Sequence, residues 1–387
     1  MAARFLNGNR LTLLRSGVEY FPALEAAIGA ARNAIFLETY IYSGDATGRR
    51  ITQALCEAAW RGVVVQVMVD GFGARDMAHE LVEDLKSAGV RLLVFRPEIF
   101  PFPWRRERLR RLHRKLVVAD ERVAFVGGIN IIDDADTPGQ RPPRYDYAVR
   151  IEGPLVDEVR EEAVRLWNRI ALARLERRWR VAHPHHTRRL PPRGSQKAAL
   201  VVRDNLRHRR DIEDAYLEAI ATAKQEIIIA SAYFFPGIRF RRALISAASH
   251  GVRVVLLLQG RVEYVLLHYA SRALYGTLLE AGVEIYEYHR SFLHAKVAVV
   301  DGHWATVGSS NIDPFSLLLA REANVVAEDR RFAAELRGSL RAAMERGARV
   351  VQKTRWFRQP LWRRVPIWLG YALARLTVGV FGPGGRF

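Results

Sequence analysis

Short runs of Val, Ile and Leu alternate with amphipathic stretches along the chain, and the same alternation occurs twice. In residues 22–71 a helical pattern is followed by an apolar run at 34–42, a second helical pattern and a second apolar run. Residues 214–260 repeat this order, with the first apolar run at 226–234. Such short runs are typical of strands buried on both faces, and their alternation with helices predicts a layered α/β sheet.

Each copy of this unit is followed by the same spaced set of polar and small residues. The set reads His, any residue, Lys, four residues, Asp, six residues, Gly, Gly or Ser, any residue and Asn. Its members are His113, Lys115, Asp120, Gly127, Gly128 and Asn130 in the first half, and His294, Lys296, Asp301, Gly308, Ser309 and Asn311 in the second. A full set that recurs at equivalent places of a repeat indicates a working site rather than a degenerate copy.

The two motifs also make geometric sense. Residues 115–128 and 296–309 are predicted to form β-hairpins that turn at Asp120 and Asp301. Because residues i and i+2 of a strand point to the same side, each histidine projects together with its lysine. The glycines allow a close turn that brings each asparagine to the same end. If the halves pack about a pseudo-two-fold axis, all of these side chains meet in one pocket.

This inventory suits the cleavage of a phosphodiester, without a metal ion or cofactor. Lysine and asparagine side chains can hold the non-bridging oxygens as negative charge develops. One neutral histidine can attack phosphorus, and the other, protonated, can give its proton to the leaving alkoxide. Each histidine needs a carboxylate on its other ring nitrogen. Asp146 lies 33 residues after His113 and Glu322 lies 28 after His294, so each is expected to orient the histidine that precedes it.

The doubled motif resembles that of the phospholipase D superfamily, and residues 308–329 are similar to the bacterial cardiolipin synthases of that superfamily. The resemblance spans about residues 10–345. It implies an α/β fold of two tandem phospholipase D-like α/β/α sandwich domains, related by a pseudo-two-fold axis, with the active site at their interface.

The resemblance also implies roles for individual residues. Asp120 and Asp301 are expected to be structural rather than catalytic. His113 is favoured as the nucleophile, although the pseudo-symmetry leaves His294 open. Gly128 departs from the serine that many members have at this position of the first motif, and one hydroxyl is therefore missing from that half.

The charge balance adds information about partners. The chain has 60 Lys and Arg against 41 Asp and Glu, a net charge of +19, which points to nucleic acid or an anionic membrane surface. The single cysteine, Cys56, excludes an intramolecular disulfide and fits a reducing cytoplasm. No apolar stretch is long enough to predict a spanning helix. The expected organisation is a first domain at 1–170, a basic linker at 171–197, a second domain at 198–345 and a basic aromatic tail at 346–387.

Tryptophans lie among the basic residues in two segments. Trp104 precedes an arginine-rich run before the first motif, and Trp356, Trp362 and Trp368 lie in a tail with nine Lys and Arg and no acidic residue. This composition is typical of the interface of an anionic bilayer. A single-strand nucleic-acid groove has similar features, but the apolar run of the tail is longer than such an arm needs. Pro360 and Pro366 are expected to break the tail into short pieces, with residues 366–381 forming one interfacial helix rather than a span.

The expected function is a peripheral phosphatidyltransferase of the cardiolipin synthase type at the cytoplasmic face of the cell membrane. A phosphatidyl group would pass from phosphatidylglycerol through a phosphohistidine to a second phospholipid alcohol, and glycerol would leave. Two alternatives stay open: a phospholipase D or other phosphodiesterase, in which water replaces the alcohol, and a non-enzymatic binder of membranes or nucleic acid. The sequence does not name the acceptor lipid. Because one chain carries both motifs, no obligate protein partner is expected.

Overall fold

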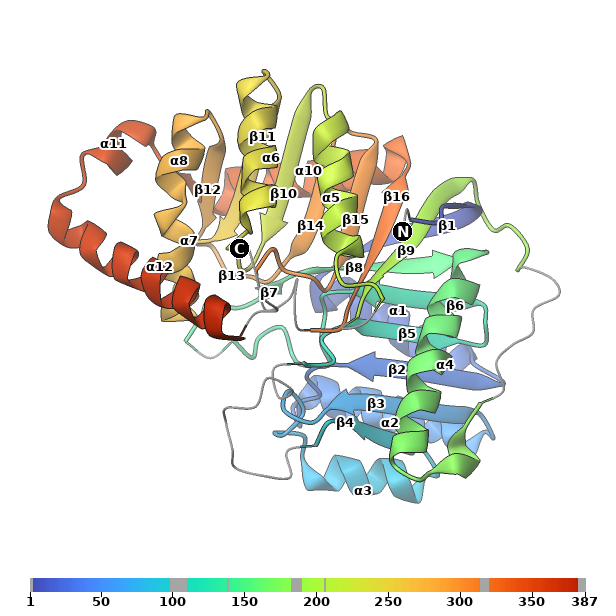
Figure 1. Cartoon of the computed structure of the whole chain (residues 1–387). Helices are drawn as coiled ribbons and strands as arrows, with labels where there is room; N and C mark the ends of the chain where they lie inside the picture. The colour runs from blue at the N-terminus through green and yellow to red at the C-terminus, as the bar shows by residue number, and fades with distance from the viewer. Residues whose placement is uncertain are drawn as a thin grey trace.

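The strands of the chain join almost entirely into one continuous sheet. The computed structural model describes residues 3–97, 110–137, 139–181, 190–204, 207–313 and 320–381. Within this part the sheet has the order β17-β12-β11-β10-β14-β15-β16-β9-β1-β8-β6-β5-β2-β3-β4 (Figure 1). A second, two-stranded sheet pairs β7 with β13 in parallel, and it joins the two halves of the chain.

The elements of the first half are four helices and eight strands within the described residues. Its strands are β1 (Leu6–Arg15), β2 (Ala34–Thr39), β3 (Val64–Asp70), β4 (Arg91–Phe95), β5 (Lys115–Ala119), β6 (Val123–Gly127), β7 (Arg144–Tyr145) and β8 (Tyr147–Glu152). Its helices are α1 (Ser16–Ala30), α2 (Ala46–Trp60), α3 (His79–Ser87) and α4 (Leu155–Ala173).

The second half repeats this order and adds elements at its end. Its strands are β9 (Gln196–Arg203), β10 (Glu226–Ser231), β11 (Arg253–Gln259), β12 (Glu284–Tyr288), β13 (Phe292–Leu293), β14 (Lys296–Val300), β15 (Trp304–Gly308), β16 (Glu322–Glu328) and β17 (Ala348–Val350). Its described helices are α5 (Asp211–Thr222), α6 (Ile238–Ser249), α7 (Val265–Ala273), α8 (Tyr275–Glu280), α10 (Arg330–Gly347), α11 (Lys353–Phe357) and α12 (Leu361–Phe381).

The strand order makes the internal repeat visible. Read outward from the centre, the first half runs β1-β8-β6-β5-β2-β3-β4 and the second runs β9-β16-β15-β14-β10-β11-β12, which is the same arrangement of equivalent elements. The antiparallel β1–β9 pair joins the halves, so the pseudo-two-fold axis passes between these two strands. The predicted pair of tandem α/β/α domains is confirmed.

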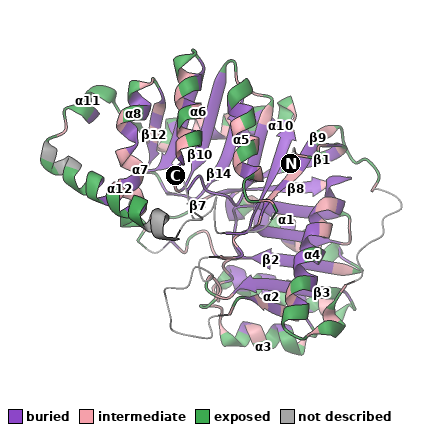
Figure 2. Ribbon diagram, viewed as in Figure 1, coloured by how far each residue is buried: buried purple, intermediate pink, exposed green. Residues whose placement is uncertain are grey.

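Helices cover both faces of the sheet and fix the two halves relative to one another. In the first half α1, α2 and α3 lie on one face and α4 on the other, and in the second half α10 lies opposite α5 and α6 (Figure 1). Helix α4 contacts β5 and β6 but also β9, and α10 contacts β14 and β15 but also β1. Trp167 of α4 and Phe332 of α10 belong to one buried cluster that spans both halves. The strands are buried almost throughout, whereas the helices keep exposed outer faces (Figure 2).

Two boundaries differ from the sequence-based expectation. Helix α4 continues to Ala173, so the domain limit expected at residue 170 falls inside it. The linker expected at 171–197 is not irregular throughout, because it contains a 3₁₀ turn at Arg177–Trp179 and the first residues of β9.

The tail is integrated into the second half rather than separate from it. Strand β17 pairs with the edge strand β12, and α12 packs along α7. Helix α12 continues through Pro366, so the expected break at this proline is wrong. Packing against α7 holds the helix together across the proline, although one backbone hydrogen bond is lost there. Among the described residues, no helix is both long and apolar enough to cross a membrane.

Candidate active site

Each motif histidine lies at the seam between the halves and is held by backbone of the other half. The His113 N–H donates to the Arg321 carbonyl at 3.0 Å, and the His294 N–H donates to the Tyr145 carbonyl at 2.8 Å. The residues that follow these two carbonyls are Glu322 and Asp146. The two connections are equivalent under the pseudo-two-fold axis, and they bring each histidine beside the carboxylate of the opposite half.

The carboxylates therefore orient the histidines in exchanged pairs. His113 Nδ1 lies 2.9 Å and 3.1 Å from the two carboxylate oxygens of Glu322. His294 Nδ1 lies 2.6 Å from Asp146 Oδ2. The expectation that each carboxylate serves the histidine before it in the sequence is wrong. The reason is topological: β8 and β16, which follow or begin at the carboxylates, flank the central β1–β9 pair and so face the other half.

The two motif lysines are buried beside the histidines. Lys115 Nζ donates to the His113 carbonyl at 2.5 Å, and Lys296 Nζ donates to the equivalent carbonyl of His294. Lys296 Nζ also lies 3.4 Å from Asp146 Oδ2. As the sequence predicts, Lys115 is the first residue of hairpin strand β5 and Lys296 is the first residue of hairpin strand β14.

Burial sets the electrostatics of this cluster. It lowers the pKa of Lys115 to about 7 and also lowers the pKa of Lys296. Burial likewise lowers the pKa of His113 and takes that of His294 well below its usual value. Burial opposes ionisation of Asp146, but Lys296 and His294 outweigh it and lower the pKa of this carboxyl. The Lys296 charge acts on both His113 and Lys115, so the two motifs share one electrostatic site.

The two motif asparagines are buried where the second strand of each hairpin ends. Asn130 Oδ1 accepts from the Ile41 N–H at 3.1 Å, which leaves its amide NH₂ available to donate. Asn311 Oδ1 has no hydrogen-bond partner within the described part of the chain. Both amides follow hairpins whose open ends carry Lys115 and Lys296.

The motif aspartates occupy the opposite, closed ends of the hairpins. Asp120 accepts hydrogen bonds from three successive backbone N–H groups at 32–34, with distances of 2.5, 2.7 and 3.0 Å. Asp301 does the same at 224–226, with distances of 2.8, 2.8 and 2.9 Å. Each carboxylate therefore ties a hairpin turn to the entry of the neighbouring strand, β2 or β10, and has no contact with the histidines.

The small residues of the motifs make room for the carboxylates. A Cβ on Gly128 would lie 2.4 Å from the Asp146 carboxylate, so a serine does not fit there without a shift. At the equivalent place Ser309 Oγ donates to Glu322 Oε2 at 2.5 Å. Gly127 and Gly308 are equally constrained, by the backbone of β8 and by Asn324 respectively. Glycine in place of serine at position 128 therefore leaves the space that the Asp146 carboxylate occupies against the backbone.

Several residues at the site carried no motif signal. The Tyr40 ring lies 4.9 Å from the His113 ring, and the Arg144 guanidinium lies 5.2 Å from the Phe292 ring, which neighbours His294. Asp70, at the end of β3, accepts from the Leu112 N–H at 2.8 Å, one residue before His113.

Gln259, at the equivalent end of β11, accepts from the Leu293 N–H at 3.3 Å, one residue before His294. Asp70 and Gln259 hold equivalent places in the internal repeat, and that equivalence is the signal that would have found them.

The tryptophans expected at a membrane have different environments. Trp356 is buried, with its ring 5.2 Å from that of Tyr275, so its assignment to a membrane surface is wrong; it fills the core of the second half. Trp362 and Trp368 of α12 are 67% and 57% exposed. Trp104 lies outside the described residues.

Comparisons with known proteins agree with this geometry. The profile of the family described as "Cardiolipin synthase, PLD-like domain" matches residues 24–167 and 216–344. Cardiolipin synthase B of Escherichia coli K12 is 41% identical over 362 residues, which cover 94% of this chain and 87% of the relative. The major cardiolipin synthase of Bacillus subtilis is 29% identical over 370 residues, covering 94% and 74%.

Solved structures show the same fold at low sequence identity. The phosphatidylserine synthase of Haemophilus influenzae has a TM-score of 0.71 at 14% identity, and the alignment covers 97% of this chain and 96% of that structure. The doubled motif, the shared architecture and the close relatives converge on one assignment. The chain belongs to the cardiolipin synthase family of phospholipase D-like proteins.

Proposed function

We propose that the chain is a cardiolipin synthase-type phosphatidyltransferase that moves a phosphatidyl group from phosphatidylglycerol to a second phospholipid alcohol. The observation that carries this proposal is the pair of histidines, each with Nδ1 on a carboxylate of the opposite half and with a buried lysine beside it. Relatives that are named cardiolipin synthases support the choice of substrate.

In the first step His113 is the nucleophile. Because its Nδ1 faces Glu322, the lone pair lies on Nε2, which attacks phosphorus. The bond between phosphorus and the glycerol oxygen breaks, and glycerol leaves with a proton donated by His294. Lys115, Lys296 and the two asparagines hold the non-bridging oxygens, whose charge grows in the transition state.

In the second step the acceptor alcohol takes the place of glycerol. His294, now neutral, accepts the hydroxyl proton, and the oxygen attacks phosphorus as the P–N bond to His113 breaks. The products are cardiolipin and the starting enzyme with its protons restored. Binding of the anionic phosphodiester favours one added proton on the pair of histidines. Burial in the empty site depresses the pKa of His294 more than that of His113, but attack by His113 requires its Nε2 to be unprotonated, so the reactive form is the one in which His294 holds the proton.

We also propose that the protein works as a peripheral enzyme on the cytoplasmic, anionic face of the cell membrane. Two neighbouring segments supply an interfacial surface of exposed apolar side chains: Val262, Tyr264, Val265 and Leu266 at the start of α7, and Trp362, Val365, Trp368, Leu369, Leu373 and Leu376 on α12. Helix α12 packs on α7, so the two segments lie side by side. The net charge of +19 favours anionic lipid.

Product analysis tests the proposal. The pure protein is incubated with phosphatidylglycerol micelles, with and without phosphatidylethanolamine, and the products are identified by mass spectrometry, with His113→Ala as the control. Cardiolipin and free glycerol are expected. Stimulation by phosphatidylethanolamine with release of ethanolamine would identify this lipid as a second phosphatidyl donor, since its head group has no free hydroxyl to act as acceptor. Phosphatidic acid alone contradicts the transferase and favours a hydrolase, in which water replaces the alcohol.

A further inference from the structure

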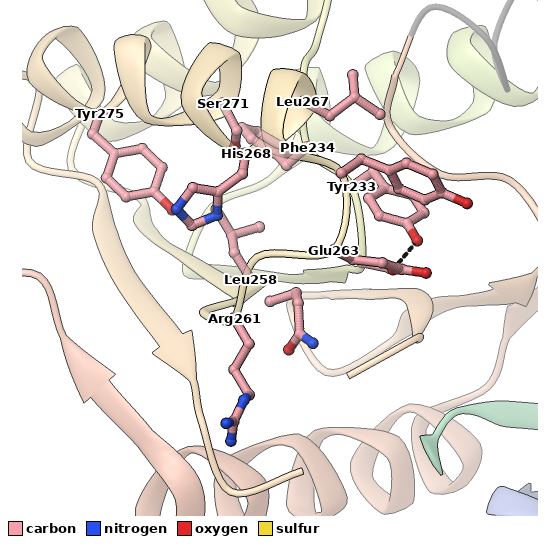
Figure 3. Close-up of a pocket in the computed structure, with 12 residues that line it drawn as sticks. Tyr233, Phe234, Leu258, Arg261, Glu263, Leu267, His268, Ser271 and Tyr275 are labelled. Atoms are coloured by element: carbon pink, nitrogen blue, oxygen red, sulfur yellow. Dashed lines mark hydrogen bonds between the residues drawn. The ribbon is translucent and has the colours of Figure 1, made fainter. Parts of the chain in front are cut away.

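One wall of the active site is not symmetric. In the first half Tyr40 lies against His113, but the equivalent residue of the second half is Ala232. The space on that side is bordered by Tyr233 and by the loop that leads into α7. The Tyr233 hydroxyl donates to Glu263 Oε2 (Figure 3). The Tyr233 ring lies 5.4 Å from that of Tyr264.

This wall belongs to the active site rather than to a separate surface. Ala232 and Gln259 line the same space as Glu263 and contact the two neighbours of His294. The Ala232 N–H donates to the Ala295 carbonyl at 2.9 Å, and Gln259 accepts from the Leu293 N–H at 3.3 Å. The loop that carries Glu263 is anchored to the first half, because Gln140 Nε2 donates to the Val262 carbonyl at 2.8 Å.

A narrow cavity opens behind the Glu263 carboxylate. It has a volume of about 30 Å³, room for one or two water molecules or head-group hydroxyls, and not for an acyl chain. Figure 3 shows Tyr233 and Glu263 at one end and His268, Ser271 and Tyr275 at the other. Within the described residues, Tyr233 is the hydrogen-bond partner found for the Glu263 carboxylate, which therefore keeps capacity to accept further hydrogen bonds.

The chemistry of this wall is opposite to that of the phosphate site. Lysine and arginine hold an anion, whereas a carboxylate beside two tyrosines repels a phosphate and accepts hydrogen bonds from hydroxyl groups. In the proposed reaction the leaving glycerol and the entering alcohol occupy the same place in turn. Both carry a second hydroxyl next to the reacting one.

We propose that Glu263, held by Tyr233, is the binding site for the non-reacting hydroxyl of the alcohol that leaves and enters. This inference rests on the proposed transferase function and adds its selectivity: alcohols with a neighbouring hydroxyl are preferred over simple primary alcohols. A buried acceptor left without its donor is costly, so the preference is expected to be large.

Competition between two soluble alcohols tests this site. The full-length protein is given phosphatidylglycerol with labelled glycerol and 1-propanol, and head-group exchange into phosphatidylglycerol is compared with formation of phosphatidylpropanol. Wild type is expected to favour glycerol. Glu263→Ala is expected to lower the glycerol-to-propanol ratio at least tenfold, and Tyr233→Phe at least fivefold. In both variants the KM for glycerol should rise, whereas the rate of propanol transfer should stay within about twofold of wild type.

Glu218→Gln, an exposed carboxylate on α5, is the control and should leave the ratio unchanged. An unchanged ratio in both site variants overturns the inference, and so does an equal loss of both products in variants that unfold at the wild-type temperature. If the wild type itself transfers to neither alcohol and forms no cardiolipin, the proposed function fails, which is a different result from transfer without selectivity.

Discussion

At the scale of single residues, the central feature is the exchange of carboxylates between the halves. Glu322 orients His113 and Asp146 orients His294, so neither half contains a complete histidine–carboxylate pair. Each motif histidine is thus oriented by a carboxylate more than a hundred positions away in the sequence. Substitutions of His113 and Glu322 should therefore have similar effects on activity, and so should substitutions of His294 and Asp146.

A donor with a good leaving group separates the two pairs. The p-nitrophenyl ester of phosphatidic acid needs no general acid, because p-nitrophenolate leaves unprotonated. His294→Ala and Asp146→Asn should slow the first-turnover burst of p-nitrophenol release less than tenfold, yet lower cardiolipin formation about a hundredfold or more, because breakdown of the intermediate still needs His294 as a base. His113→Ala and Glu322→Gln should lower both. Loss of p-nitrophenol release in Asp146→Asn, with release kept in Glu322→Gln, would contradict the assigned pairs. Asp120→Asn is the control, because Asp120 belongs to the motif but lies outside the site.

The pH dependence of the same assay follows from the pKa shifts. Burial keeps the pKa of His113 below its usual 6.5. The neutral nucleophile should therefore persist at pH 6.5, and kcat/KM should fall only at lower pH as His113 becomes protonated. Lys115 has a pKa of about 7, so its cation is lost as pH rises through 7 and kcat/KM should fall there. Lys115→Arg keeps the charge and should move the alkaline limb upward. A wild-type profile that is flat from pH 6.5 to 9 would contradict this account.

Most of the site residues were predictable because they occur twice. The doubled motif identified His113, His294 and their lysines, since chance does not place the same spaced set at two equivalent positions. The pairing of the carboxylates was not predictable, because spacing along a chain does not say which half a strand faces. Tyr233 and Glu263 were missed for another reason: they occur in one half only and leave no repeated signal.

At the scale of elements, buried strands and hairpins followed directly from the hydrophobic pattern. Runs such as 226–234 contain no alternation because both faces of β10 are covered, by helices on one side and by the shared core on the other. The tail was not predictable in the same way. Its tryptophans have similar sequence surroundings, but packing places Trp356 in the core and leaves Trp362 and Trp368 exposed.

The three tail tryptophans should therefore respond differently to substitution. Trp362→Ala with Trp368→Ala should weaken binding to anionic liposomes about tenfold or more, because exposed apolar surface is removed from the interfacial surface. Trp356→Ala should instead lower the free energy of unfolding by about 3 kcal/mol, since it empties part of a core. Liposome flotation and thermal unfolding measure these effects.

Trp60→Ala provides a matched control for the liposome measurement, because Trp60 is 71% exposed on α2, outside the interfacial surface. Its liposome binding should equal that of wild type. Equal weakening by Trp60→Ala and by the α12 variant would show that α12 is not the membrane contact.

At the scale of the whole molecule, the pseudo-two-fold axis generates one site from two half-sites, and the halves are not identical. Under α4, Arg114 makes ion pairs of 2.6 Å with Glu38 and Glu162, but the equivalents of Arg114 and Glu38 in the second half are Ala295 and Ala230. Such differences allow equivalent histidines to take different roles. In the proposed mechanism His113 makes the covalent attack and His294 transfers the proton.

Trapping the covalent intermediate tests that assignment most directly. The phosphorus-labelled p-nitrophenyl ester of phosphatidic acid is mixed with His294→Ala, which can form the intermediate but lacks the base for its breakdown, and the quenched protein is cut into peptides. An acid-labile, base-stable label is expected on the peptide that contains His113. Absence of label from His113 in this variant while wild type forms cardiolipin would contradict the assignment, and so would label on His294 in the wild type.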